Sequence, residues 1–156
     1  MTALSNSLLQ RWPGAFFQQR ADFTFESVSP RMETLTGVSA SQLEKTPELF
    51  WQVVHELDVE RVKKEVERVP DMPEGVTSLF RIRQAPSGRV IYISEFRRAV
   101  LDAKGKILGY EGFWLDATRQ TKVEQRLVAS AWKEVLSQVT LGFAHDFNNS
   151  LTGILV

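Results

Sequence analysis

The spacing of apolar residues changes several times along this chain. Before residue 29, short stretches alternate between apolar and polar side chains, as in residues 23–26. Helical spacing follows up to residue 69, alternation returns between residues 77 and 115, and helical spacing resumes at residue 118. Alternation is typical of half-buried strands, and steps of three and four residues are typical of helices. The pattern predicts strands, then short helices, then three more strands and a final helix.

The first half of the chain is divided by residues that start or stop helices. Strand candidates cover 15–19 and 23–28, before a helix with Ser29 as N-cap and Pro30 at its first position. Gly37 is the expected end of that helix. Further starts and stops are predicted at Ser39 or Ser41, at Pro47, at Asp58 before a helix over 59–69, and at Pro70 and Pro73.

The second half predicts a sheet. Strand candidates cover 77–84, 90–100 and 107–115, and turn sequences over 85–88 and 102–106 separate them. Three hairpin-linked strands after a group of short helices indicate an antiparallel α+β domain, with the helices on one face of the sheet.

The final stretch, 118–156, contains no proline and predicts one long helix. Its apolar residues recur at three- and four-residue steps, at Val128, Trp132, Val135, Val139, Phe143, Phe147, Leu151 and Ile154. On an isolated helix, this apolar stripe would be open to water. A parallel coiled coil that continues into a helix bundle would bury it, so we expect a homodimer through residues 118–156.

Residues 4–11 are open to two interpretations. Leu4, Leu8 and Leu9 are spaced for a short amphipathic helix that packs on a sheet face or mediates dimerisation. A frayed terminus is an equally good interpretation.

Composition excludes several classes of function. Lys and Arg number 19, as do Asp and Glu, so no net charge attracts nucleic acid or an acidic membrane. The absence of cysteine excludes disulfides, thiolate metal sites and cysteinyl adducts. No apolar run approaches the roughly 18 residues that a membrane-spanning helix needs, and the N-terminus lacks the features of a signal peptide. We therefore expect a cytoplasmic protein without a nucleic-acid partner or a membrane segment.

One of the two histidines, His145, lies in a pattern that suggests a reactive site. At helical pitch, Asn149 and Thr152 fall on its side of the helix, and Phe143 and Phe147 fall on the opposite side. A neutral imidazole can attack a phosphoryl group, Asp146 could assist the proton transfer, and Asn149 could position a water. The simpler interpretation is a solvated histidine on a helix.

Residues 144–154, Ala-His-Asp-Phe-Asn-Asn-Ser-Leu-Thr-Gly-Ile, resemble the phosphoacceptor box of sensor histidine kinases. The resemblance implies that His145 is phosphorylated, that Asp146 is the assisting acid or base, and that Asn149 serves in dephosphorylating the partner. Ser150 departs from the family, which more often has Leu at this position.

Residues 15–118 resemble a PAS domain. The similar runs are 23–30 with 35–37, Val54-His55-Glu56-Leu57-Asp58, 102–112 and the exit Asp116-Ala117-Thr118. Glu56 and Leu57 depart from the family pattern. The expected organisation is an N-terminal short helix or cap over 1–14, a PAS sensory domain over 15–117, a signalling coiled-coil helix over 118–138 and the first part of a dimerisation and phosphoacceptor helix over 139–156.

Other candidate sites have ordinary structural interpretations. His55 precedes the helix expected to carry a haem ligand, and that helix contains no histidine, so we expect a structural His55 and no metal. The aromatic residues of the second half have two interpretations, an ordinary packed core or the lining of a ligand cavity between sheet and helices. They are Phe80, Tyr92, Phe96, Phe113 and Trp114. The basic residues Arg97 and Arg98 are expected on a solvated face.

No glycine-rich phosphate loop occurs in the chain. The family's ATP-binding domain is expected after residue 156, so this chain alone should be inactive and hold no cofactor, while the parent kinase would use ATP and Mg²⁺. The sequence is thus interpreted as the sensory and dimerisation part of a two-component histidine kinase, in which His145 passes phosphate to a response regulator receiver domain. The alternative is a PAS interaction and dimerisation module without phosphotransfer.

Overall fold

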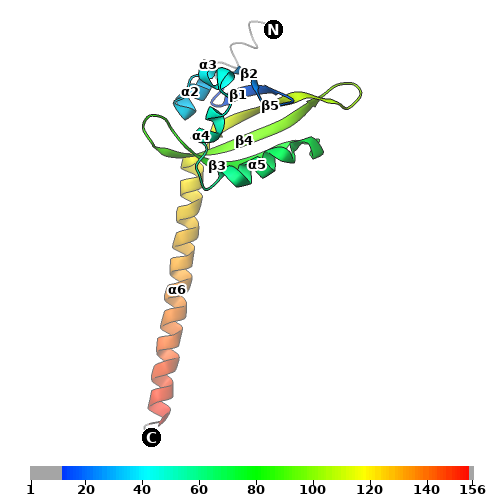
Figure 1. Cartoon of the computed structure of the whole chain (residues 1–156). Coiled ribbons are helices and arrows are strands. Elements are labelled where there is room, and N and C mark those ends of the chain that lie inside the picture. The colour runs from blue at the N-terminus through cyan, green and yellow to red at the C-terminus, as the bar shows by residue number, and fades with distance from the viewer. Residues whose placement is uncertain (1–11, 155–156) are drawn as a thin grey trace. The chain divides into compact units, whose positions relative to one another are not determined.

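The computed structural model describes the backbone of residues 12–154 and the side chains of residues 12–135 and 137. The chain divides into two compact units, Met1–Thr118 and Arg119–Val156. The first unit contains one antiparallel sheet of five strands in the order β2-β1-β5-β4-β3 (Figure 1). The strands are β1 (Ala15–Arg20), β2 (Phe25–Val28), β3 (Val76–Arg83), β4 (Val90–Leu101) and β5 (Ile107–Asp116).

Short helices connect β2 to β3. They are α2 (Arg31–Thr36), α3 (Ala40–Lys45), α4 (Leu49–Val53), α5 (Val59–Glu67) and the 3-10 helix η1 (Val69–Asp71). The second unit consists of helix α6 (Thr118–Ile154), which begins at the last residue of the first unit. The expected α+β class with an antiparallel sheet is confirmed. Within the described part of the chain, no helix has the length and apolar character needed to span a bilayer.

Local sequence explains where two of the short helices end and begin. Gly37 is the C-cap of α2 with φ of 76°, a left-handed conformation that glycine adopts without steric cost. Ser39 begins α3 with a capping box, in which its side chain and that of Gln42 satisfy each other's backbone N–H groups. Both residues have the roles that the sequence predicts.

Two expected features of the first half differ in the structure. Ser29 does not cap α2, because its Oγ accepts a hydrogen bond from the backbone N–H of Phe16 at 2.9 Å. Phe23 lies in the turn before β2 rather than in the strand, with φ of 64°. In both places a hydrogen bond to β1 replaces the structure expected from the neighbouring residues. Ser29 bonds to Phe16, and Phe23 bonds to Gln19.

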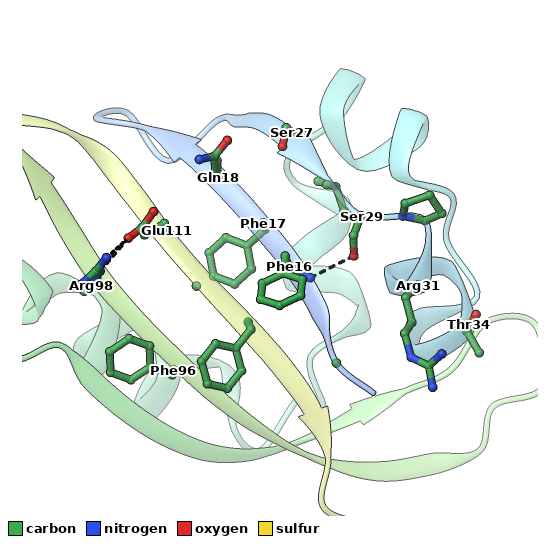
Figure 2. Close-up of a pocket in the computed structure, with 15 residues that line it drawn as sticks. Phe16, Phe17, Gln18, Ser27, Ser29, Arg31, Thr34, Phe96, Arg98 and Glu111 are labelled. Atoms are coloured by element: carbon green, nitrogen blue, oxygen red, sulfur yellow. Dashed lines mark hydrogen bonds and ion pairs between the residues drawn. The ribbon is translucent and has the colours of Figure 1, made fainter. Parts of the chain in front are cut away.

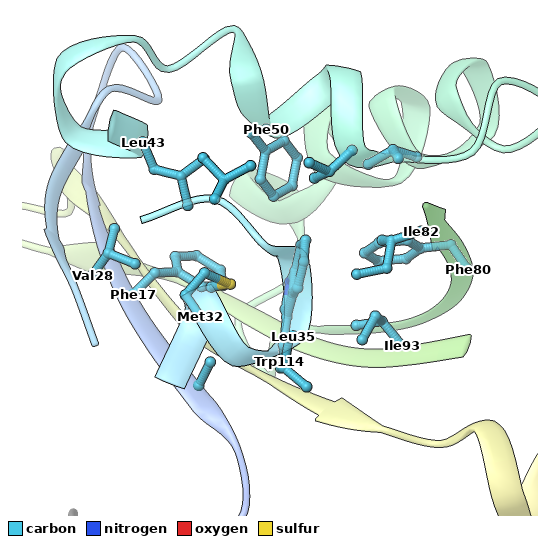
Figure 3. Close-up of a cluster of buried hydrophobic side chains, with 14 of the residues drawn as sticks. Phe17, Val28, Met32, Leu35, Leu43, Phe50, Phe80, Ile82, Ile93 and Trp114 are labelled. Carbon is cyan, nitrogen blue, oxygen red and sulfur yellow. The ribbon is translucent and has the colours of Figure 1, made fainter. Parts of the chain in front are cut away.

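The hydrophobic core lies between one face of the sheet and the short helices (Figure 3). Trp114, near the end of β5, is fully buried, and its ring lies 5.3 Å from the Phe50 ring and 5.4 Å from the Phe80 ring, centroid to centroid. Ile82, Ile91, Ile93 and Met32 complete the centre of this layer. Burial of each such side chain stabilises the fold by about 1.5–3 kcal/mol.

Helix α6 is a separate unit with an apolar stripe. Its described part exposes five large apolar side chains, which are Val123, Leu127, Val128, Trp132 and Val135. Trp132 is 63% exposed and Val128 is 58% exposed. Burial of this stripe in a coiled coil, as expected from the sequence, requires a second helix.

Candidate functional site

An ion pair lies in the interior of the first unit, on the face of β4 that the helices cover. Arg97 Nε donates to Glu95 Oε1 at 2.6 Å, and the side chains are 2% and 3% exposed. Arg97 was expected on a solvated face, and that expectation is wrong. Residues 91, 93, 95 and 97 point to one side of a strand, and in β4 that side is the buried one.

Two further side chains complete this buried cluster. Arg97 Nη1 donates to Gln19 Oε1 at 2.5 Å, and Trp114 Nε1 donates to Glu95 Oε2 at 2.5 Å. The Gln19 amide nitrogen in turn donates to the backbone carbonyl of Phe23 at 2.9 Å. Both carboxylate oxygens of Glu95 are thus satisfied, and the two charges cancel.

The rings of Phe17 and Phe50 enclose the guanidinium of Arg97. Its Cζ lies 4.8 Å from the Phe17 ring centroid and 5.7 Å from that of Phe50. Gly112 makes room for this arrangement, since a Cβ there would lie 2.6 Å from Phe17 Cζ. Among the described residues, Arg97 Nη2 has no hydrogen-bond partner. The core therefore contains one hydrogen-bond donor, Arg97 Nη2, that lies beside aromatic rings and does not bond to the Glu95 carboxylate.

Phe23 closes one end of this cluster. Its ring stacks on Tyr110 with centroids 4.5 Å apart and planes 11° apart. A positive φ in a bulky residue costs energy, of order 1–3 kcal/mol, and here the stacking and the hydrogen bond from Gln19 hold it. Burial raises the pKa of Tyr110, while the charge of Arg97 opposes that rise.

The aromatic residues considered for a cavity separate into two groups. Phe80 and Trp114 lie in the core, and Phe96 and Phe113 lie on the opposite face of the sheet, stacked at 5.6 Å. These aromatics do not line a single interior cavity. The remaining histidine, His55, is largely buried, and its Nδ1 accepts a hydrogen bond from the N–H of Leu57 at 3.3 Å. In the described residues, no group of three or more potential ligands could hold a metal ion.

The sheet face without helices carries an open groove of about 840 Å³ (Figure 2). Its floor contains three phenylalanines from neighbouring strands, Phe16, Phe96 and Phe113. Its polar side chains come from strands β2, β1, β5 and β4 and from the start of α2, and are Gln18, Ser27, Ser29, Arg31, Thr34, Arg98 and Glu111. A surface of this kind can bind an apolar segment or a flat apolar molecule.

Asp58 joins α5 to the sheet rather than capping its own helix. Its carboxylate accepts hydrogen bonds from Arg81 Nε at 2.9 Å, Arg81 Nη2 at 2.8 Å and the Arg81 backbone N–H at 2.8 Å. The expected side-chain cap of α5 is absent. The hydrogen bonds from Arg81 lower the pKa of Asp58 from 3.8 to about 2, against an opposing effect of burial.

The Asp58 carboxylate should make the fold sensitive to acid. Its pKa is lowered by folding, so its contribution is present above pH 3.8 and disappears as the pH falls toward 2. We expect Asp58→Asn to lower the free energy of unfolding by up to about 2 kcal/mol at pH 7. The difference from wild type should shrink in urea titrations near pH 2. Glu60→Gln, at an exposed pair with Lys63, is the control and should change little at either pH. A difference that does not vary with pH would contradict the role of the charge.

The exit from the sheet is anchored to β4. The Thr118 hydroxyl accepts a hydrogen bond from the Tyr92 N–H at 2.9 Å, and the Ala117 N–H donates to the Tyr92 carbonyl at 2.9 Å. Asp116 Oδ1 accepts the N–H of Thr118 at 2.9 Å and so satisfies one of the backbone N–H groups at the start of α6 that have no partner within the helix. Ala117 and Thr118, the last residues of the first unit, are therefore held to the beginning of β4.

The three residues predicted to carry chemistry, His145, Asp146 and Asn149, belong to α6. Their side chains lie outside the described residues. The helical backbone places residues 145 and 149 one turn apart. The roles of these side chains remain the predictions made from the sequence.

A single antiparallel sheet with short helices on one face, followed by an exit helix, defines a class of small α+β domains. Residues 25–114 match the model of the family described as the PAS fold, which covers more than half of the 156 residues. The chain belongs to this family.

Solved structures support the same fold. A sensory box histidine kinase/response regulator from Burkholderia thailandensis aligns with a TM-score of 0.65 at 16% identity, over 83% of this chain and 95% of that chain. The N-terminal domain of a diguanylate cyclase with PAS/PAC sensor from Marinobacter aquaeolei aligns with a TM-score of 0.61 at 19% identity, over 69% and 98%. The PAS domain of a protein from Colwellia psychrerythraea aligns with a TM-score of 0.61 at 17% identity, over 74% and 98%. Comparison with curated proteins gives no match.

Proposed function

We propose that this chain is the sensory and phosphoacceptor part of a sensor histidine kinase. The PAS domain receives a signal, α6 relays it, and an imidazole nitrogen of His145 accepts the γ-phosphoryl group of Mg-ATP, which leaves ADP. A response regulator receiver domain then takes the phosphoryl group. A histidine-kinase ATP-binding domain acts on this helix, and the protein works in the cytoplasm.

One observation carries the proposal. The phosphoacceptor-like sequence over 144–154 lies in the same helix that begins at the anchored exit of the PAS domain, α6 (Thr118–Ile154). A change at the Tyr92–Thr118 contact can therefore be transmitted toward His145 through one continuous helix. The fold of the Burkholderia relative, whose name includes both kinase and response regulator, is consistent with this assignment.

The relay that we propose works through a parallel dimer of α6. Paired helices can occupy two alternative registers or rotations, and a signal that favours one of them changes the surroundings of His145. The exposed stripe from Val123 to Val135 supports this pairing, because a second copy of α6 would cover it.

Phosphorylation tests the proposal directly. A histidine-kinase ATP-binding domain, fused after residue 156 or added separately with Mg-ATP, should label the chain with acid-labile phosphate. His145→Gln should abolish the label, and Asp146→Asn should slow labelling about 10²–10⁴-fold, the usual range for acid–base assistance. The other histidine gives a matched control, because His55→Gln should leave labelling intact. Undiminished labelling of His145→Gln would refute the assignment.

The alternative function is an interaction module in which α6 only dimerises. The diguanylate cyclase relative illustrates that this fold also occurs with a different type of enzyme. The two functions differ in the labelling experiment, since an interaction module would remain unlabelled in fusion with an active ATP-binding domain. They agree on the dimer, so dimerisation alone does not distinguish them.

A further inference from the structure

The apolar stripe of helix α6 divides into two groups. At about 100° per residue, Val123 and Leu127 lie about 40° apart and form the first group. Val128, Trp132 and Val135 lie within about 60° of one another and form the second group, whose centre is about 130° around the helix from that of the first. All five side chains are between 48% and 66% exposed. One contact line along the helix therefore does not cover both groups.

Neither group extends into the other along a coiled-coil repeat. The apolar positions of a coiled coil alternate in steps of three and four residues. Continued in these steps toward the C-terminus, the first group reaches Ser130 and Glu134. Continued toward the N-terminus, the second group reaches Gln125 and Thr121. Each group thus ends at polar residues, and the apolar side of the helix changes between residues 127 and 128.

The remaining side of this part of α6 is basic. Lys122, Arg126 and Lys133 are exposed and lie within about 40° of one another, at least about 80° from the centre of either apolar group. Two copies that paired through this side would bring like charges together, which is unfavourable. A second copy of α6 can therefore cover the first group or the second group, but not the basic side.

We propose that α6 pairs with a second copy of itself in two alternative ways, through the second group in one state and through the first group in the other. A parallel pair is symmetric, so each residue of a group meets the same residue of the partner helix. The two states exclude each other, because each helix turns by about 130° between them. The second group buries three large apolar side chains against two, so its pair is the more stable one.

The exchange between the two states would also act at a distance. Because α6 (Thr118–Ile154) is one continuous helix, a turn of its described part also turns position 145. Two packed arrangements of one helix pair form a bistable element of the kind that relays signals. This regulatory role rests on the proposed function, whereas the two ways of pairing do not.

Disulfide cross-linking in the full-length chain distinguishes the two states. The chain contains no cysteine, so Leu127→Cys and Val128→Cys each introduce one thiol, on adjacent residues of different groups. A disulfide needs Cα atoms no more than about 7 Å apart, so only residues at the contact line react when copper phenanthroline is the oxidant. Both variants should cross-link, Val128→Cys faster. Lys133→Cys, on the basic side, is the control and should react at least about tenfold more slowly than either.

Aspartate substitutions show whether the two states exclude each other. Adding Val135→Asp should slow the cross-linking of Val128→Cys and speed up that of Leu127→Cys, each at least about tenfold, because mass action moves the released chains into the other pairing. Trp132→Asp should have the same effect. Val123→Asp should slow the cross-linking of Leu127→Cys alone. If Val135→Asp slows both cysteine variants, or leaves Leu127→Cys unchanged, the two pairings are not alternatives and the proposal is overturned.

The regulatory role has its own measurement. Dimers locked by the disulfide of Leu127→Cys or of Val128→Cys are incubated with Mg-ATP and a histidine-kinase ATP-binding domain. Their rates of phosphate labelling should differ at least about tenfold, since each lock fixes one rotation of the helix. Equal rates would overturn the regulatory role. If neither the locked dimers nor the unlocked chain is labelled, the proposed function is refuted, and the cross-linking result still decides between one and two pairings.

Discussion

Replacing Glu95 with alanine is expected to destabilise the PAS domain by about 3–5 kcal/mol, the usual cost of removing one partner from a buried ion pair. The substitution leaves the charge of Arg97 without a counter-ion in a site that is 2% exposed, and it removes the acceptor of the Trp114 N–H. A domain of this size is stable by about 5–15 kcal/mol. The urea midpoint, followed by circular dichroism, should therefore fall sharply.

The same sheet offers a matched control on its other face. Arg98 and Glu111 lie directly opposite each other on β4 and β5 and form an ion pair, but Arg98 is 57% exposed and Glu111 is 33% exposed. Glu111→Ala should cost no more than about 1 kcal/mol, as expected for a surface pair. Equal losses from Glu95→Ala and Glu111→Ala would show that burial does not determine the cost.

A double substitution tests the electrostatic explanation. Glu95→Leu with Arg97→Met removes both charges and keeps the core filled, and such replacements of buried pairs are often neutral or stabilising. The double variant should be more stable than either single variant. If its loss equals the sum of the two single losses, the two charges do not interact as described.

Substituting Val135 with aspartate should separate the proposed α6 dimer. Burial of one such side chain is worth at least about 1.5 kcal/mol, and a symmetric dimer loses it twice, or about 3 kcal/mol. The dissociation constant should therefore rise at least about a hundredfold, as measured by sedimentation equilibrium. The PAS sheet should keep its urea midpoint, because Val135 belongs to the separate unit Arg119–Val156.

Ser137→Asp is the control for this prediction, since it adds the same charge two positions away and about 200° around the helix. It should leave the dimer intact, whereas Trp132→Asp should weaken it as Val135→Asp does. A dimer that is unaffected by Val135→Asp and Trp132→Asp must be formed by other surfaces, and the interpretation of the apolar stripe would then be wrong.

Local patterns in the sequence predict the elements of this fold well. The strand candidates 77–84, 90–100 and 107–115 agree within two residues with β3, β4 and β5, because alternation and turn residues are local signals. Gly37 and Ser39 have the capping roles expected from their conformational preferences. The order β2-β1-β5-β4-β3 depends on long-range pairing and was not predicted.

The interior cluster was missed for an identifiable reason. Charged residues were assigned to solvent and the apolar Phe96 to a possible cavity, but strict alternation from Ile91 and Ile93 places Glu95 and Arg97 inside and Phe96 outside. The alternation was therefore a better guide than residue type. Ser29 and Asp58 show a different limit, because each gives up its local capping role for a partner 13 or 23 residues away.

Strand β4 also limits how this domain can be altered by inserting or deleting residues. Its two faces carry incompatible sets of side chains, Glu95 and Arg97 toward the core and Phe96 and Arg98 toward the groove. Adding one residue before position 95 would move both charges of the buried pair to the outer face and turn Phe96 and Arg98 inward. Adding two residues would keep each set on its own side and shift only the pairing with β3 and β5. Length changes in this strand should therefore be tolerated only in pairs.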